Sequence, residues 1–155
     1  MQERTLVLLK PDAVQRGIIG KIIERFEQKG LKIVGLKMLH ASDALLEKHY
    51  SHHKDKPFFK DLKGFMQSSP IVGLVLEGID AVKAVRLVCG STKARESEGG
   101  TIRGDFGMGW TANIVHASDS IENAASEIER FFDENEIFEY GRCDYQLIYV
   151  GEESH

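Results

Sequence analysis

The stretch RTLVLLK at residues 4–10, followed by Pro11 and Asp12, decides how the rest of the chain is arranged. Its centre, residues 6–9, is an unbroken apolar run, which is typical of a buried strand. The proline ends that strand, because it cannot donate a hydrogen bond to a β-ladder. Other segments are either continuously apolar or alternate in part between apolar and polar residues. Further strands are predicted over residues 31–40, 71–77, 114–115 and 145–150.

Helices are predicted between these strands. Apolar residues recur at helical spacing from Ile19 to Phe26, and Gly30 follows as a C-terminal cap. Ser42 is a good N-cap for a short helix over residues 44–50. The remaining helices are expected over residues 58–67 after Pro57, over residues 79–89, and from an Asp119 cap through Phe132.

This order of elements predicts an α+β fold of the ferredoxin-like, split-βαβ type with an inserted helical hairpin. The sheet is expected to be antiparallel, with helices packed on one face. Residues 90–109 are rich in glycine and lack periodicity, which predicts a long loop that binds something or is disordered. No repeat or linker divides the chain, so residues 1–155 are expected to form a single domain.

The composition excludes several classes of protein. It is 42% hydrophobic and 28% charged, as in a globular protein, and no apolar run is long enough to cross a membrane. The formal net charge of −4 argues against a protein that coats nucleic acid. The start of the chain lacks the features of a signal peptide, and the two cysteines form no CxxC pair, so a reduced, cytoplasmic location is expected.

Among six histidines, His116 has the most suggestive surroundings. It lies where a short apolar strand is expected to end and a helix to begin, close to backbone amides that could bind an anion. A neutral imidazole is a good nucleophile toward phosphorus if a partner holds its second nitrogen, and Glu127 on the following helix could be that partner. The residues alone leave a structural and a catalytic role for His116 equally open.

The other histidines are expected to have structural or solvent-exposed positions and no catalytic role. His49 and His53 are four residues apart near a helix end, and a solvated helix end is favoured over a metal pair that includes them or His52. His40 ends a strand and is expected to be partly buried or hydrogen-bonded. His155 is terminal and is expected to be disordered.

Four separate segments resemble the nucleoside diphosphate kinase family, in the right order along the chain. Residues 113–119 (NIVHASD) are similar to the family's active-site signature N-x-x-H-[GA]-S-D, and residues 101–106 read TIRGDF as in that family. Residues 10–20 resemble its opening KPD-x-V-x-R-G-x-x-G. Tyr50 and the segment at residues 56–59 (KPFF) also stand where the family places them.

The resemblance implies the mechanism of that family. Nδ1 of His116 would take the γ-phosphate of a nucleoside triphosphate such as ATP, and a nucleoside diphosphate would then remove it, which gives ping-pong kinetics. Such a reaction maintains triphosphate pools for nucleic acid synthesis. Glu127, with Ser118, would hold the ring in its reactive tautomer, and Tyr50 would lie close to the transferred phosphate.

The resemblance also implies how nucleotides are bound. Phe58 would stack on the base, a contact that purines and pyrimidines both accept. Mg²⁺ would be held mainly by the nucleotide phosphates, without a cage of protein ligands. From the residues alone, Phe58 could instead be core, Arg86 solvated and Tyr50 a packing residue. The residues that match the family's phosphate and sugar ligands are Lys10, Arg86, Thr92, Arg103 and Asn113.

Several positions depart from the family pattern. Ala94 and Gly99 stand where the family's loop usually carries prolines, so this loop is expected to be more flexible. The resemblance implies a homo-oligomer, with a hexamer favoured. Because this loop makes subunit contacts in the family, its lack of prolines leaves a tetramer or a dimer possible. Trp110 and Ala112 replace an aliphatic residue and an arginine. Trp110 either alters how the base is sandwiched or packs against the neighbouring loop.

Two rival hypotheses remain. An inactive regulatory module of the same fold would be expected to lack His116, Lys10 or Arg103, and all three are present. The other is an active enzyme whose cellular role is to bind DNA or a partner; the acidic net charge disfavours binding to nucleic acid without excluding it. We therefore expect neither a membrane nor an obligatory nucleic acid among the partners, which are nucleoside di- and triphosphates.

Overall fold

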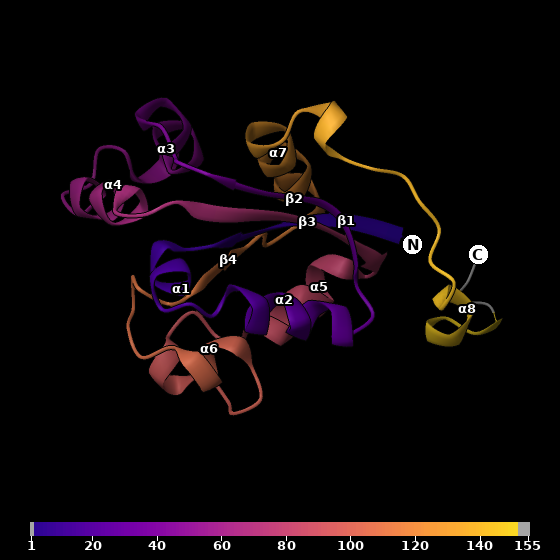
Figure 1. Ribbon diagram of the computed structural model, residues 1–155. Coiled ribbons are helices and arrows are strands. Elements are labelled where there is room, and N and C mark those ends of the chain that lie inside the picture. The colour runs from indigo at the N-terminus through magenta and orange to yellow at the C-terminus, as the bar shows by residue number, and fades with distance from the viewer. Residues whose placement is uncertain (1, 152–155) are drawn as a thin grey trace.

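A computed structural model describes residues 2–151, so the expectation for His155 lies outside the described part of the chain. One antiparallel sheet with the strand order β2-β3-β1-β4 forms the centre of the molecule (Figure 1). The predicted α+β, ferredoxin-like fold class is confirmed. The strands are β1 (Gln2–Leu9), β2 (Lys32–Leu39), β3 (Ile71–Ile79) and β4 (Val115–Ala117).

Helices follow the predicted places closely in most of the chain. Ser42 caps its helix as expected, since its side chain accepts a hydrogen bond from the Leu45 amide at 3.1 Å. Within residues 2–151 no helix is long and apolar enough to cross a membrane. The α-helices are α1 (Pro11–Gln15), α2 (Ile19–Gln28), α3 (Asp43–His49), α4 (Phe59–Gln67), α5 (Ala81–Cys89), α6 (Ile102–Phe106), α7 (Ile121–Phe131) and α8 (Tyr145–Ile148), and the 3-10 helices are η1 (Ser51–His53), η2 (Ala94–Glu96) and η3 (Glu134–Glu136).

The prediction that helices pack on one face of the sheet is wrong, because both faces are covered. In β1, Val7 and Leu9 point into a cluster shared with α1, α2, α5 and α6. Leu6 and Leu8 point the other way, into a cluster shared with α3, α4 and α7. Figure 1 shows these two groups of helices on opposite sides of the strands. The apolar run of β1 is unbroken because each of its faces is buried.

Other local predictions need correction. Residues 145–150 were expected to be extended, but they begin with helix α8. Residues 90–109 contain η2 and α6, and are therefore not a plain loop. Ser120, not Asp119, caps α7, with its side chain accepting from the Asn123 amide at 3.1 Å. Asp119 accepts instead from the Asn123 side chain.

Gly104 in α6 leads to a prediction about stability. A Cβ at this position would lie 1.9 Å from the carbonyl oxygen of Glu98, a backbone atom that cannot move aside cheaply. We expect Gly104→Ala to destabilise the protein by about 1–3 kcal/mol. In the control Gly64→Ala, the new Cβ meets no atom within 4 Å in α4, and a stabilisation of about 0.5–1 kcal/mol is expected. Urea unfolding of both variants measures the difference, and equal stabilities would contradict the prediction.

Candidate active site

The sheet places His116 and Lys10 next to each other. His116 is the middle residue of β4 and pairs with Leu8 of β1, and Lys10 follows directly after β1 ends. The backbone amide of Lys10 donates to the carbonyl of Ile114 at 2.8 Å. Two side chains more than a hundred residues apart in sequence therefore meet at the same end of two neighbouring strands.

Ile114 was expected to belong to the strand, but it lies before β4 in a left-handed conformation with φ of 75°. This region is unfavourable for a β-branched residue and costs about 1–3 kcal/mol. The carboxylate of Asp12 holds the turn in place by accepting from the Ile114 amide at 3.0 Å. Such a strained turn is commonly found where side chains are held for function. Here the turn at Ile114 lies in the chain between two predicted site residues, Asn113 and His116.

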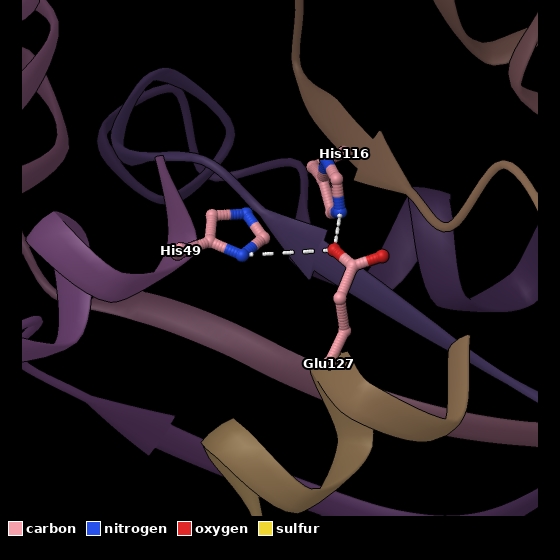
Figure 2. Close-up of side chains that lie close together, drawn as sticks. All are labelled: His49, His116 and Glu127. Atoms are coloured by element: carbon pink, nitrogen blue, oxygen red, sulfur yellow. Dashed lines mark hydrogen bonds and ion pairs between the residues drawn. The ribbon is translucent and has the colours of Figure 1, made fainter. Parts of the chain in front are cut away.

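Among the described residues, the His116 ring is hydrogen-bonded through one of its two nitrogens. Its Nε2 lies 2.5 Å from Oε2 of Glu127, which comes from α7, and Figure 2 shows the other ring nitrogen turned away from that carboxylate. Burial would raise the pKa of Glu127, but hydrogen bonding and charge, chiefly from His116, lower it below its usual range. An ionised carboxylate only accepts, so Nε2 carries the proton and Nδ1 keeps its lone pair.

Ser118 is fully buried and reaches Glu127 rather than His116. Its hydroxyl is among the smaller hydrogen-bonding influences that lower the pKa of Glu127, and it also contacts the backbone of Leu6 at 3.4 Å. Any influence of Ser118 on the imidazole would therefore pass through the Glu127 carboxylate.

Lys10, Asn113 and Thr92 form a connected polar chain. Nζ of Lys10 donates to Oδ1 of Asn113 at 2.7 Å, and Nδ2 of Asn113 donates to the backbone carbonyl of Thr92 at 3.0 Å. Burial, assisted by the charge of Arg103, lowers the pKa of Lys10 to about 8. The ammonium group is thus poorly solvated and would gain from contact with an anion.

Arg103 is buried and donates to three backbone carbonyls. Its Nε bonds Asn113 at 3.2 Å, Nη1 bonds Gly90 at 2.9 Å, and Nη2 bonds Val115 at 2.6 Å. Burial lowers the pKa of the guanidinium, although a group of this kind stays charged. Arg103 therefore ties the segment after α5 to β4 and places a fixed positive charge beside them.

A cavity of about 580 Å³ opens over these residues. Its size suits a small-molecule ligand, and basic side chains outnumber the acidic pair Asp119 and Glu127, which favours an anion. Of the ten predicted site residues, eight line it: Lys10, Tyr50, Arg86, Thr92, Arg103, Asn113, His116 and Glu127.

Ser118 and Phe58 are the two predicted residues that do not line the cavity. Phe58 is 47% exposed, whereas the neighbouring Phe59 is core, as expected for one of the pair. The ring of Phe58 lies 5.1 Å from that of His53, which does line the cavity, so Phe58 stands just beyond its rim. Trp110 lies outside as well, with the ammonium group of Lys93 5.6 Å from its ring.

Tyr50 and Arg86 reach the cavity from different sides. Tyr50 also packs against the cluster under α3, and burial together with the charge of Glu127 raises its pKa to about 12. Its hydroxyl is therefore protonated at neutral pH and can donate a hydrogen bond. Arg86 is exposed on α5, where it is free to meet a ligand.

For His49, which also lines the cavity, the prediction of a solvated helix end is wrong. It is not at a solvated helix end: it is buried, and its ring lies 4.8 Å from that of His116. With His116 and Glu127 it forms a cluster whose three potential ligand atoms lie within 4.8 Å of one another. The signal was available, because His49 follows the buried Leu46 by three residues on a short helix. His40, by contrast, is exposed rather than partly buried.

Comparisons with known proteins agree on one family. The model of the family described as nucleoside diphosphate kinase matches residues 3–137. A nucleoside diphosphate kinase from Thermoplasma acidophilum is 54% identical over 96% of this chain and all of its own length. Nucleoside diphosphate kinase A from Mus musculus is 49% identical over 95% of this chain and 97% of its own.

Solved structures give the same answer. A halophilic nucleoside diphosphate kinase from Halobacterium salinarum, in complex with CDP, superposes with a TM-score of 0.93 at 43% identity, covering 96% of this chain and 99% of that one. A family protein from Babesia bovis gives a TM-score of 0.92 at 46% identity over 95% of this chain and 99% of its own. The chain therefore belongs to the nucleoside diphosphate kinase family of phosphotransferases, enzymes that act on nucleoside phosphates.

Proposed function

We propose that His116 is the nucleophile of a ping-pong phosphoryl transfer and is transiently phosphorylated on Nδ1. The observation that carries this proposal is the 2.5 Å contact between Nε2 of His116 and Glu127, which leaves Nδ1 as the nitrogen with a free lone pair. The cluster of basic side chains around the cavity supports an anionic substrate at the same place.

In the first half-reaction, the lone pair of Nδ1 forms a bond to the γ-phosphorus, and the bond from phosphorus to the β–γ bridging oxygen breaks. The electron pair leaves with the nucleoside diphosphate. The imidazole gains positive charge as the bond forms, and the Glu127 carboxylate at Nε2 stabilises that charge. In the second half-reaction, a terminal oxygen of another nucleoside diphosphate attacks the phosphorus and restores neutral His116.

The other residues of the cavity position the nucleotide. Lys10 and Arg103 are fixed in place by hydrogen bonds, and we assign to them the neutralisation of phosphate charge. The hydroxyl of Tyr50 donates to the transferred phosphoryl group. Phe58 at the rim stacks on the base, so that ADP, GDP and CDP are all accepted. Arg86, Thr92 and Asn113 complete the contacts to phosphate and sugar.

The donor atoms around the cavity fit a magnesium ion carried by the nucleotide. Glu127 is engaged with His116, and the group of His49, His116 and Glu127 offers two nitrogens, whereas Mg²⁺ prefers oxygen. Asp119 is the other carboxylate on the lining and would supply the protein's oxygen ligand. Such an ion would supply positive charge that offsets the negative charge of the nucleotide phosphates.

We also propose a setting for this enzyme: a single-domain homo-oligomer, with a hexamer favoured over a tetramer or dimer, that uses ATP to maintain triphosphate pools in the cytoplasm. Leu36 and Met38 support assembly, because they are more than half exposed on β2, an edge strand. Both cysteines are unpaired, which suits a reducing compartment. Light scattering at several concentrations distinguishes the three assemblies.

The test of the function uses purified protein and ATP labelled on the γ-phosphate. Without an acceptor, the protein is expected to become labelled in an acid-labile, base-stable form. Adding GDP, CDP or dTDP is then expected to remove the label and to yield the matching labelled triphosphate. A protein that remains unlabelled under these conditions would overturn the proposal, and label that is stable in acid would place the phosphate on a different kind of residue.

The pKa of Lys10 predicts a decline of activity at alkaline pH. Because burial lowers this pKa to about 8, the free enzyme loses the ammonium charge as the pH rises through that value. We expect kcat/KM to fall by about tenfold between pH 7 and pH 9, with a smaller change in kcat because bound phosphates favour the charged form. In Lys10→Arg, whose guanidinium stays charged, this decline should disappear. A profile that is unchanged in Lys10→Arg would assign the titration to another group.

A further inference from the structure

Beside His116, two side chains of the cavity lining have no role in the proposed phosphoryl transfer. His49 extends from α3, and its ring meets the His116 ring edge-on, with 4.8 Å between the centroids (Figure 2). Arg130 extends from α7, and its Nη1 lies 3.0 Å from Nδ1 of His49. The same Nδ1 lies 3.6 Å from Oε2 of Glu127, which is beyond hydrogen-bonding distance.

The contact with Arg130 fixes the tautomer of His49. A guanidinium can only donate, so Nδ1 of His49 accepts and the ring proton sits on Nε2. Burial lowers the pKa of His49 to about 3, so the ring is neutral. In this form His49 donates nothing to Glu127. The buried Nε2 has no partner among the described residues, so the ring's one hydrogen bond is the one from Arg130.

Arg130 and Glu127 are three residues apart on α7, a spacing that makes side chains neighbours on a helix. A guanidinium and a carboxylate that can reach each other form one of the strongest pairs in proteins, commonly through two hydrogen bonds. Such a pair would draw the Glu127 carboxylate away from His116. The structure instead places the neutral ring of His49 against both groups.

We propose that His49 is a positioning residue, which accepts the hydrogen bond of Arg130 and thereby reserves the Glu127 carboxylate for His116. The inference rests on the proposed role of His116 as nucleophile. It explains why a histidine is buried beside the reacting ring in a form that cannot itself exchange protons with it. It also assigns a function to the contact between Arg130 and His49, two side chains of the cavity lining.

The test measures the rate at which labelled ATP phosphorylates the protein in a single turnover. In His49→Ala, Arg130 is released, and we expect the rate to fall at least about tenfold with little change in ATP affinity. Removing the freed guanidinium should reverse the effect, so His49→Ala/Arg130→Met is expected to react faster than His49→Ala alone. Arg130→Met completes the cycle. His40→Ala, at an exposed histidine that does not line the cavity, is the matched control.

Conservative variants separate this role from simple packing. The side-chain oxygen of asparagine can accept where Nδ1 did, so His49→Asn should retain more activity than His49→Ala. Glutamine reaches the Nε2 position and should not. A double variant no faster than His49→Ala would overturn the proposal, as would His49→Ala reacting at the rate of His40→Ala. Full labelling of a His116→Ala protein would instead overturn the proposed nucleophile, so the two failures are distinguishable.

Discussion

Replacing His116 by alanine is expected to abolish phosphoryl exchange, with a loss of about 10⁵-fold in kcat. The reason is that no neighbouring group can take its place. His49 is the nearest imidazole, but its Nδ1 is occupied by Arg130, and its Nε2 carries a proton and is buried. Steady-state exchange between ATP and GDP, together with labelling of the protein in the absence of acceptor, measures the loss.

Nucleotide binding should survive this change. Lys10 and Arg103 take their positions from Asn113 and from backbone carbonyls, and none of these contacts involves His116. Calorimetric titration with ADP is therefore expected to give an affinity close to that of the unmodified protein. The control is His40→Ala, which should keep full activity. Acid-labile labelling of His116→Ala would place the nucleophile on another residue.

Replacing Glu127 by glutamine is expected to lower the phosphorylation rate by about 10²–10³-fold and to leave KM nearly unchanged. The amide can still accept a hydrogen bond from Nε2, but it is neutral and stabilises the developing imidazolium charge less well. The amide can also turn its NH₂ group toward Nε2, which would favour the unreactive tautomer. Rapid-quench measurement of the labelled protein separates this step from nucleotide binding.

Glu129→Gln is the matched control for this prediction. Glu129 lies on the same helix α7, carries the same charge and is exposed. It should react at the rate of the unmodified protein. If Glu127→Gln and Glu129→Gln proved equally active, the orientation of His116 by Glu127 would be irrelevant to the chemistry. Thermal unfolding of both variants shows whether either loss comes from the fold instead.

The sequence predicted best what depends on neighbouring residues. The buried strands β1 and β3 follow from apolar runs, and α3 begins at Ser42 because its hydroxyl can cap a helix. The four-residue helix α8 could not be found in this way, since its Tyr and Ile residues favour strands in isolation. Tertiary contacts decide its structure: the Tyr149 hydroxyl accepts from the Ile79 amide at 3.1 Å.

The covering of both faces of the sheet was foreseeable in part. A strand buried on one face alternates, whereas residues 6–9 are all apolar and wholly buried. Interpreting that run as two-sided would have predicted helices on both faces. The N-cap of α7 was harder to predict from the sequence, because Asp119 and Ser120 are both good N-cap residues and only the backbone geometry distinguishes them.

For the active site, each sequence motif identified a few residues that are close together in the chain. The fold then brings residues from different motifs to one place. β1, α5, β4 and α7 bring Lys10, Arg86, His116 and Glu127 to one cavity. The burial of His49 could have been inferred from its three-residue spacing from Leu46. Its contact with Arg130 could not, because it joins residues 81 positions apart that no local pattern relates.

Arg103 has a consequence for how this family can diverge. It holds Gly90, Asn113 and Val115 by their carbonyl oxygens, which every amino acid possesses. These three hydrogen bonds therefore do not depend on which side chains stand at the three anchor residues, and they hold the backbone path whatever those side chains are. Arg103 itself has no such freedom, because lysine offers a single ammonium and could not replace three separately directed N–H groups.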